Sequence, residues 1–433
     1  MIATSVIVIV TFVLLTSSIL FLPSLKAGKR RVATYWIVAL AGAVLLLSLR
    51  LVPLREVGEA LVADDSINPL KILILFFSMT FLSVVLDEVG FFRYLANKAV
   101  RLAGRKQFSL FTTFYFLTAI LTVFTSNDVV ILTLTPFICF FCKNAKADPL
   151  PYLVGEFAAA NTWSMMLVIG NPTNVYLATS AGIDFLGYLR VMALPTLVSG
   201  ALEFALIALL FGRRLKAELS PEEERVEITS KPDLIVGLIH LGVCLLFLVL
   251  SGYLHIEMWL VSAVCAGSLL LSLLVIRLVM RSGWRTLGDS FARLPWQLIP
   301  FVLSMFVIVI AIRYQGISAK LGAFLGEKQV VWTYGVSSFF AANLINNIPM
   351  SILFSTLPTA LSEAAKTQAI FASVVGSNVG AFLTPIGALA GIMFTDLTAR
   401  YEVKYGFKEF ITYGAMISLP TLAAALFVLR LVL

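Results

Sequence analysis

The most constraining feature of this chain is an apolar stretch whose length fits neither one membrane-spanning helix nor two. From Phe108 to Cys142 it runs for 35 residues, and its strongly polar interruption is Ser126-Asn127-Asp128. As a single helix it would measure roughly 52 Å, against a hydrocarbon core about 30 Å thick. Divided at the polar residues, it leaves arms of 17 and 14 residues, which are roughly 25 and 21 Å long and short for a crossing. The stretch therefore predicts two half-length helices that meet inside the membrane.

Composition places the whole chain in a membrane. Of its 433 residues, 60% are hydrophobic and 13% are charged, whereas soluble domains carry about 25% charged residues. The net charge of +8 comes from basic residues in short loops between apolar runs, so it indicates membrane topology and not a nucleic-acid partner. The sequence predicts an all-α polytopic membrane protein with about ten crossings, surrounded by the lipid bilayer.

Basic residues flank the long apolar stretch on both sides. Arg105 and Lys106 precede it, and Lys143 and Lys146 follow it. Because short loops rich in Lys and Arg stay in the cytoplasm, both ends are expected there. The segment 108–142 is thus predicted to be a re-entrant hairpin, which dips in from the cytoplasm and turns at its three polar residues.

The same rule orients the rest of the chain. Four basic residues make the first loop, 26–31, cytoplasmic, which places the N-terminus and the acidic loop 56–65 outside. The polar linker 212–233 is also cytoplasmic, and it separates a first half, 1–211, from a second half, 234–433. The C-terminus is expected outside, and the protein is expected to be multi-pass in the cell inner (plasma) membrane.

The two halves contain four matching motifs in the same order. The pairs are Ser78-Met79 to Gly90 with Ser304-Met305 to Gly316, Asn127-Asp128 with Asn346-Asn347, Asn161 to Gly170 with Asn378 to Gly387, and Leu-Pro-Thr-Leu at 194–197 with the same motif at 419–422. Each half has an odd number of expected crossings, so the second half begins on the opposite face. We therefore predict an inverted-topology repeat, the architecture of many secondary transporters. The second half then has its own hairpin, 330–361, and each half has a broken helix, 152–180 and 367–394.

These irregular segments predict where a substrate binds. Backbone at membrane depth must be hydrogen-bonded internally unless it is buried in protein or lines a wet cavity. We expect the hairpin tips and the helix breaks, at Ile169–Asn174 and Thr384–Gly387, to meet near mid-membrane and to free backbone groups for binding. The candidate substrate-binding residues are Ser126, Asn127, Asp128, Asn161, Asn171, Thr173, Asn174, Asn346, Asn347, Asn378 and Thr384.

Two acidic residues lie within apolar segments. An ionisable residue at mid-depth is costly and usually functional, so we predict that Asp128 is the ion-coupling residue. A second interpretation, which is compatible with the first, is that Asp128 caps the helix that follows it. For Glu203 we expect a position at the lipid interface or a pairing between helices, with a proton relay as the alternative.

At these residues the chain resembles the ion transporter superfamily, and within it the arsenite/antimonite permease (ArsB) group, near the NhaD-type sodium/proton antiporters. The motifs that carry the resemblance are LDEVGFF (86–92), NDVVILTLTP (127–136), PWQLIPFVLSM (295–305), NNIPM (346–350) and LTPIGALAGIMF (383–394). The pattern spans nearly the whole chain in order.

The resemblance implies a secondary active transporter whose hairpin-bearing part moves, elevator-like or by rocking, against a scaffold made from the first helices of each half. It implies proton-coupled efflux of a small oxyanion or a metalloid hydroxide such as arsenite or antimonite. It also implies, for some such permeases, a soluble ATPase partner; this chain has no G-x-x-x-x-G-K-[ST] phosphate-binding motif of its own.

Other functions stay open within the transporter class. They are Na⁺-coupled transport of a divalent anion, such as a dicarboxylate or sulfate, and Na⁺/H⁺ antiport. An intramembrane enzyme is disfavoured, because the chain has two His and no second aspartate at the other hairpin tip, and a gated channel would not need two broken helices. We expect no catalytic residue, metal site or cofactor. Substrate identity, coupling ion, transport direction and oligomeric state, a homodimer included, are left open.

Overall fold

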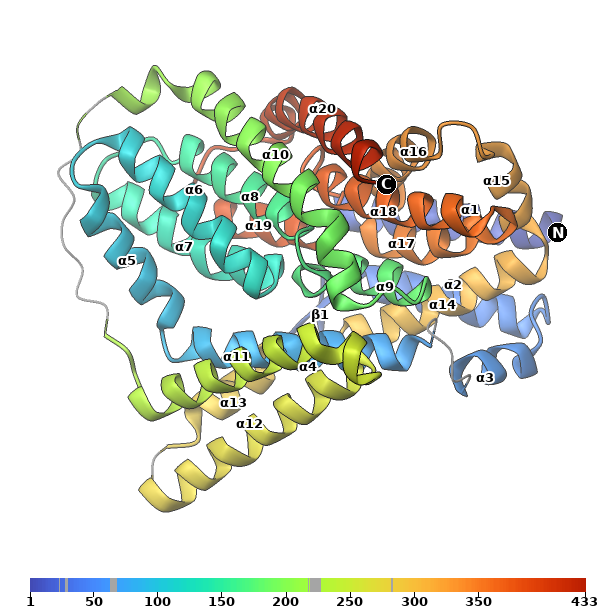
Figure 1. Cartoon of the computed structure of the whole chain (residues 1–433), viewed down its shortest axis with the longest axis horizontal. Coiled ribbons are helices and arrows are strands. Elements are labelled where there is room, and N and C mark those ends of the chain that lie inside the picture. The colour runs from blue at the N-terminus through green and yellow to red at the C-terminus, as the bar shows by residue number, and fades with distance from the viewer. Residues whose placement is uncertain (23, 28–29, 63–67, 217, 219–226, 282) are drawn as a thin grey trace.

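The computed structural model describes the chain apart from residues 23, 28–29, 63–67, 217, 219–226 and 282. The described part is almost entirely helical (Figure 1), as the sequence predicts. The exception is a pair of short antiparallel strands, β1 (Ser24–Ala27) and β2 (Arg30–Ala33), in the first basic loop. Parts of that loop, of the acidic loop 56–65 and of the linker 212–233 lie outside the described residues.

Within the described residues each half contains ten α-helices. Those before the linker are α1 (Ile2–Phe21), α2 (Tyr35–Ser48), α3 (Leu54–Val62), α4 (Pro69–Glu88), α5 (Phe91–Ala103), α6 (Gln107–Phe124), α7 (Asn127–Asn144), α8 (Leu150–Trp163), α9 (Pro172–Ser180) and α10 (Phe185–Phe211). Those after it are α11 (Lys231–Leu254), α12 (Met258–Met280), α13 (Arg285–Arg293), α14 (Leu298–Tyr314), α15 (Ile317–Leu325), α16 (Val330–Ile345), α17 (Asn347–Thr356), α18 (Glu363–Gly380), α19 (Leu389–Arg400) and α20 (Phe407–Val432). The short 3₁₀ turns are η1 (Val168–Gly170), η2 (Arg214–Lys216) and η3 (Leu357–Ala360).

Eight spans of the described chain are long and apolar enough to cross a membrane. Seven are single helices, α1, α4, α6, α10, α11, α12 and α20, and the eighth joins α13 to α14. The helix α6 has 18 residues, one more than the expected arm, which makes it roughly 27 Å long and close to a crossing. The length of α6 alone therefore does not show whether it crosses the membrane or forms one arm of a hairpin. The contacts before α6 and after α7 decide between these two possibilities.

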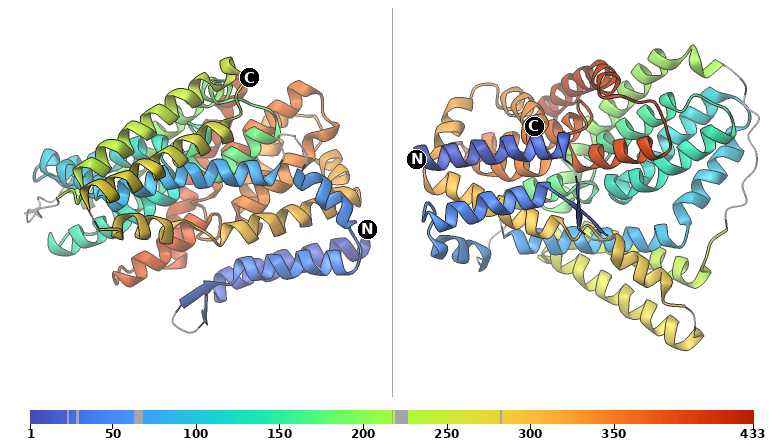
Figure 2. Two further views of the ribbon diagram at one scale, coloured as in Figure 1. Left: turned by 90° about the horizontal axis from the view of Figure 1, so that it is seen from below. Right: turned by 180° about the vertical axis from the view of Figure 1, so that it is seen from behind.

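Helix packing divides the described chain into two layers. In the first layer α2 packs against α1 and α14, and α4 packs against α11, α12 and α14. In the second layer α8 packs against α6 and α10, α18 packs against α16 and α20, and α10 crosses α20. In Figure 1 α4, α11 and α12 lie in the lower half and α10 and α20 in the upper half, and Figure 2 shows the same arrangement from below and from behind.

Four helices lie at the boundary between the layers. They are the second arms of the two hairpins, α7 and α17, and the helices that follow the two breaks, α9 and α19. The helices α7 and α9 contact α4, α17 contacts α14, and the pairs α7–α19 and α9–α17 are also in contact. The boundary between the layers is therefore where both hairpin tips and both breaks are found.

Both ends of the first hairpin, α6–α7, contact the same short segment. Just before α6, Lys106 forms an isolated backbone bridge with Glu218. Just after α7, Asp148 accepts a hydrogen bond from Arg214 at 3.0 Å. Because Arg214 and Glu218 are close neighbours in sequence, the chain enters α6 and leaves α7 at one face of the molecule.

The ends of the second hairpin, α16–α17, are also held together. Glu327, before α16, accepts a hydrogen bond at 3.0 Å from the backbone N–H of Ser362, after α17. This end of the molecule also holds the end of α14, where the Gln315 side chain accepts a hydrogen bond from the Met1 amine at 2.7 Å. The second hairpin therefore starts and finishes at the face where α14 ends.

The first hairpin lies at the opposite face, where α14 begins. Arg293, just before α14, pairs with Asp87 and Glu88 at 2.6 Å, and Thr229 of the linker donates to the Val89 carbonyl at 3.1 Å. In Figure 1 α5, which leads into the first hairpin, is at the left, and α15, which leads into the second, is at the right. Insertion from two faces is what an inverted repeat requires; the repeat itself stays a prediction.

The close crossing of α16 and α18 generates a stability prediction. A Cβ added at Gly376 would lie 2.0 Å from Ser338 Oγ and 2.4 Å from the Gly335 carbonyl oxygen. Overpacking of this kind costs about 1–3 kcal/mol, so Gly376→Ala should lower the thermal unfolding midpoint of the detergent-solubilised protein. In the matched control, Gly267→Ala on α12, the new Cβ has no neighbour within 4 Å, and we expect the midpoint to stay or rise. Equal midpoints for Gly376→Ala and wild type would contradict the crossing.

Candidate substrate-binding site

Both helix breaks are longer than the sequence predicts. The first runs from the end of α8 at Trp163 to the start of α9 at Pro172, and the second from the end of α18 at Gly380 to the start of α19 at Leu389. Pro172 suits the first turn of α9, because its missing N–H would have no partner there. Asn171 caps the same helix by accepting from Thr173 N–H at 3.1 Å. The local sequence thus explains where α9 begins.

Asn378, from the second broken helix, reaches across the first break. Its Oδ1 accepts hydrogen bonds from Ser164 Oγ at 2.8 Å and from Asn171 Nδ2 at 3.1 Å. Its Nδ2 donates to Asn174 Oδ1 at 2.6 Å. Asn174 in turn donates to the Ser164 carbonyl at 2.8 Å, so the side chains satisfy backbone that the break leaves without helical partners.

Two further contacts extend this network. Ser377 donates to Thr173 Oγ1 at 3.0 Å, which adds a second bridge between the broken helices. At the first hairpin tip, Asn127 donates to Asn161 Oδ1 at 3.2 Å. All of these side chains are buried.

The second hairpin tip binds the second break through backbone carbonyls. Asn346 Nδ2 donates to the Ile386 carbonyl at 2.9 Å, and Asn347 N–H donates to the Gly387 carbonyl at 3.0 Å. Asn346 has φ 71°, a backbone region that Asn adopts more readily than most side chains. Thr384 donates to Asn343 Oδ1 at 2.6 Å.

The structure therefore places the eleven predicted residues in two groups and two isolated positions. One continuous hydrogen-bond network joins Asn127, Asn161, Asn171, Thr173, Asn174 and Asn378. A second group on the second break contains Asn346, Asn347 and Thr384. The Oγ of Ser126 and the Oδ1 of Asn347 are buried without a hydrogen-bond partner in the described chain, so both hairpin tips retain polar atoms for a bound solute.

Asp128 faces a cavity of about 390 Å³ between the layers. The lining includes Tyr35 and Thr80 from the first layer, and Arg293 and Gln297, which precede α14. Ser126 is the N-cap residue of α7, and Asp128 lies in the first turn, so the structure does not support the interpretation of Asp128 as the cap. Its position at a helix N-terminus still favours negative charge, and no described ion pair or hydrogen bond reaches its carboxylate.

Three polar residues that the sequence argument did not select also belong to the site. Ser164 bonds to Asn378, Ser377 bonds to Thr173, and Asn343 Nδ2 donates to the Gly380 carbonyl at 2.9 Å, where α18 ends. Asn343 could have been found from its position one turn before Asn346 on the same helix. Ser164 and Ser377 carried no comparable signal in the sequence.

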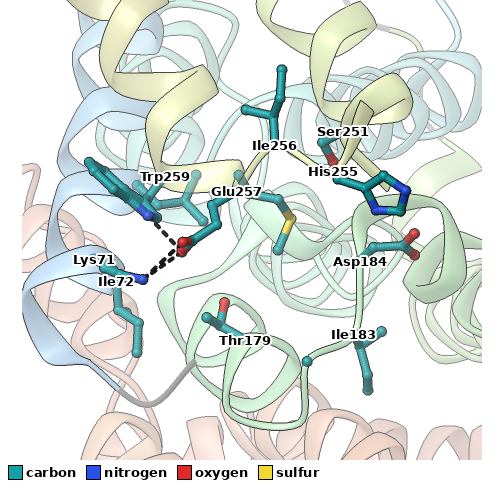
Figure 3. Close-up of a pocket in the computed structure, with 13 residues that line it drawn as sticks. Lys71, Ile72, Thr179, Ile183, Asp184, Ser251, His255, Ile256, Glu257 and Trp259 are labelled. Carbon is teal, nitrogen blue, oxygen red and sulfur yellow. Dashed lines mark hydrogen bonds and ion pairs between the residues drawn. The ribbon is translucent and has the colours of Figure 1, made fainter. Parts of the chain in front are cut away.

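A larger cavity of about 450 Å³ lies at the other face, and none of the predicted site residues lines it (Figure 3). Lys71 binds Glu257 at 2.8 Å, and Trp259 Nε1 donates to Glu257 at 2.8 Å. Asp184 and His255 line the same cavity. Lys71 and Glu257 are therefore paired with each other. This makes the cavity a weaker candidate for the substrate site.

A helical membrane protein with paired hairpin tips and broken helices around an acid-bearing cavity is a multi-pass membrane transporter. The family described as "Citrate transporter" (CitMHS) matches residues 29–376, and the chain belongs to this family.

Curated relatives agree with this class, and a solved structure is similar in fold. The chain is 26% identical to an arsenical pump membrane protein of Escherichia coli over 375 residues, which cover 82% of this chain and 85% of the relative. It is 23% identical to a putative arsenical pump membrane protein of Bacillus subtilis, with 86% and 88% covered. The YdaH transporter of Alcanivorax borkumensis matches in fold, with a TM-score of 0.56 at 15% identity over 99% of this chain and 98% of that one.

The Asn378 network yields a prediction that needs no substrate. Asn378→Ala removes the partners of Ser164, Asn171 and Asn174, and leaving buried polar groups unpaired costs about 1–3 kcal/mol each. We expect a lower thermal unfolding midpoint in detergent, whereas the control Asn144→Ala, at the exposed end of α7, should unfold like wild type. An unchanged midpoint for Asn378→Ala would mean that the network does not hold the breaks together.

Proposed function

We propose that this protein is a proton-coupled secondary transporter that exports a small oxyanion or a metalloid hydroxide, such as arsenite or antimonite. The observation that carries the proposal is the cavity lined by Asp128, which lies at a hairpin tip next to Asn127, a member of the asparagine network at the breaks. Asp128 is the proposed ion-coupling residue, because an intramembrane acid without a partner can take up and release a proton.

The chemistry of the tips supports a small hydroxylated solute. Arsenite at neutral pH is an uncharged trihydroxide, and each of its hydroxyl groups both donates and accepts a hydrogen bond. Amide and hydroxyl side chains match such a solute, because they also present donors and acceptors. The unpartnered Ser126 Oγ and Asn347 Oδ1 are the atoms from which binding would gain most.

The proposed movement follows from the two layers. We propose that the halves 1–211 and 234–433 are inverted repeats joined by the linker 212–233, and that the hairpin-bearing layer shifts against the layer built on α4 and α14. On the predicted orientation, with both termini outside, the Asp128 cavity lies on the cytoplasmic side, beside Arg293. That placement suits loading from the cytoplasm and therefore efflux. A soluble ATPase partner and a homodimer stay predictions.

A second candidate is transport of a di- or tricarboxylate with Na⁺, which the description of the family favours. A carboxylate substrate requires cationic or multiple N–H partners. The cation in the lining of the Asp128 cavity is Arg293, which already pairs with Asp87 and Glu88. The lone Asp128 carboxylate would also repel an anion, so the charges favour the neutral hydroxide.

Reconstituted protein in liposomes tests the proposal. Arsenite flux should follow an imposed pH gradient and should not require Na⁺, and citrate or sulfate should not replace arsenite. In Asp128→Asn, pH-driven flux should fall at least about tenfold, equivalent to about 1.4 kcal/mol in the barrier. The control Asp289→Asn changes an exposed aspartate on α13 and should transport like wild type. Proton-driven flux that survives Asp128→Asn unaltered, or Na⁺-driven citrate flux, would contradict the proposal.

A further inference from the structure

Glu203, on α10, is fully buried among the helices of the second layer. Its exposed fraction is 0%. One oxygen accepts from Thr162 Oγ1 on α8, and the other lies 3.0 Å from Tyr115 Oη on α6. Tyr115 is the facing titratable group, and no cation or second acid of the described chain acts on this carboxyl. Glu203 is therefore paired between helices, as the sequence favours, and not at the lipid interface.

The hydroxyl of Tyr115 lies between two acceptors, one of which is Glu203. The Tyr115 Oη lies 2.7 Å from the Gly200 carbonyl oxygen and 3.0 Å from Glu203, and its single hydroxyl proton can serve only one of these contacts at a time. Trp163 Nε1 donates to the same oxygen at 3.2 Å. When the Tyr115 hydroxyl proton is donated to Gly200, the contact with Glu203 at 3.0 Å can be completed by a proton on the carboxyl. The arrangement therefore suits a neutral carboxylic acid at Glu203.

A line of unpartnered hydroxyl groups leads from Tyr115 to the first hairpin tip. Thr118, Thr122 and Ser126 are 0%, 0% and 4% exposed, and their hydroxyl oxygens have no hydrogen-bond partner in the described chain. Other threonines nearby behave differently: Thr113 donates to the Ser109 carbonyl at 2.8 Å, and Thr125 to the Leu121 carbonyl at 2.7 Å. Among the threonines of α6 that the structure describes, only Thr118 and Thr122 therefore lack the usual hydrogen bond to a carbonyl of the preceding turn.

The spacing of these residues suits bridging water. Positions 115, 118 and 122 are three and four residues apart, which places them on one face of α6 with neighbouring Cβ atoms about 5–6 Å apart. For Thr118 and Thr122, whose hydroxyl oxygens are bonded directly to Cβ, one water with two hydrogen bonds of about 2.8 Å spans such a gap. Buried water normally satisfies polar groups of this kind.

The second hairpin shows that this fold packs without a continuous line of hydroxyls. If Asn127 corresponds to Asn346, the counterparts of Thr118, Thr122 and Ser126 are Ser337, Ala341 and Ile345. Ser337 keeps a hydroxyl but is only half-buried, and the next two positions toward the tip are apolar. In the second hairpin the line is therefore interrupted after its first position.

The acid at the far end of the line also has no equivalent in the second half. The counterpart of Tyr115 is Tyr334, so the tyrosine itself is shared. The counterpart of Glu203, counted from the matching Leu-Pro-Thr-Leu motifs, is Val428. The continuous line and its acid are therefore properties of the first half alone, which argues for a function rather than a packing requirement.

We propose that Glu203 is a second proton-binding residue and that the hydroxyl line on α6, with bridging water, conducts protons between it and Asp128. In this transfer the O–H bond of Glu203 breaks as Tyr115 or a bridging water accepts its proton. Each hydroxyl passes on its own proton as it receives one, and the last proton forms an O–H bond on the Asp128 carboxylate. One charge moves, and no oxidant or reductant is involved. The inference rests on the proposed proton coupling.

Infrared spectroscopy of the full-length protein in lipid vesicles tests this without any substrate. Wild type should show the C=O band of a protonated acid that is missing in Glu203→Gln, and this band should shift on transfer to D₂O. In Thr122→Val the shift should be at least about tenfold slower, while Thr122→Ser should restore it and the control Thr113→Val should match wild type. Absence of a Glu203 band, or equal exchange in Thr122→Val and Thr113→Val, would overturn the proposal.

A transport measurement separates this inference from the proposed function. Protons moved per substrate, read from a pH-sensitive dye inside the liposomes, should fall in Glu203→Gln and in Thr122→Val, whereas Thr113→Val should keep the wild-type ratio. If wild type moves protons and both line variants do so equally, the pathway is wrong and proton coupling stands. If wild type transports without protons, the proposed function fails, and the infrared exchange rates still decide whether the line conducts.

Discussion

Peptide groups placed in the middle of a membrane must find partners, and in this protein side-chain amides supply them. Each helix break removes intrahelical bonds from several residues, in surroundings where a lost hydrogen bond cannot be replaced by bulk water. Asn174 donates hydrogen bonds to carbonyls of the first break. Asn343 donates to the carbonyl at the end of α18, and Asn346 donates to the Ile386 carbonyl. The irregular backbone is tolerable because these asparagines point into it.

The same constraint explains why the hairpins and the breaks lie together. A hairpin tip ends two helices at once, so it needs polar neighbours, and a helix break both needs and provides them. The contacts of α7 with α19 and of α17 with α9 bring each hairpin next to the break of the other half. A substrate site at this boundary touches both layers, so a shift of one layer against the other changes access to it.

Much of this arrangement could be predicted from the sequence, because the signals were local. The polar residues 126–128 within an apolar run, and the Pro and Gly residues of the breaks, mark interruptions that a membrane helix does not otherwise contain. The lengths of the breaks could not be predicted. The first begins at Ser164, where α8 ends through contacts with Asn378 of the other half, and such long-range contacts leave no local pattern.

Of the two roles expected for Asp128, the structure does not support helix capping, and ion coupling stays a prediction. As a capping residue it would have faced its own helix, but the packing of α7 against α4 and α19 turns it toward a cavity. The pairing of Glu203 was favoured from sequence, but its partners Tyr115 and Thr162, on two other helices, were not predictable. On the predicted inverted repeat, Asp128, Glu203 and the proposed continuous line of hydroxyls between them have no counterpart in the second half. Such an asymmetry is what we expect of a single proton-coupling pathway.

The central claim is that two half-depth hairpins enter the membrane from opposite faces. Single cysteines at Lys106 and Asn144, and at Lys328 and Glu363, test it most directly, since these positions are exposed and the four native cysteines are buried. With a membrane-impermeant maleimide, positions 106 and 144 should react from one side of sealed vesicles, and positions 328 and 363 from the other. Labelling of 106 and 144 from different sides would contradict the account.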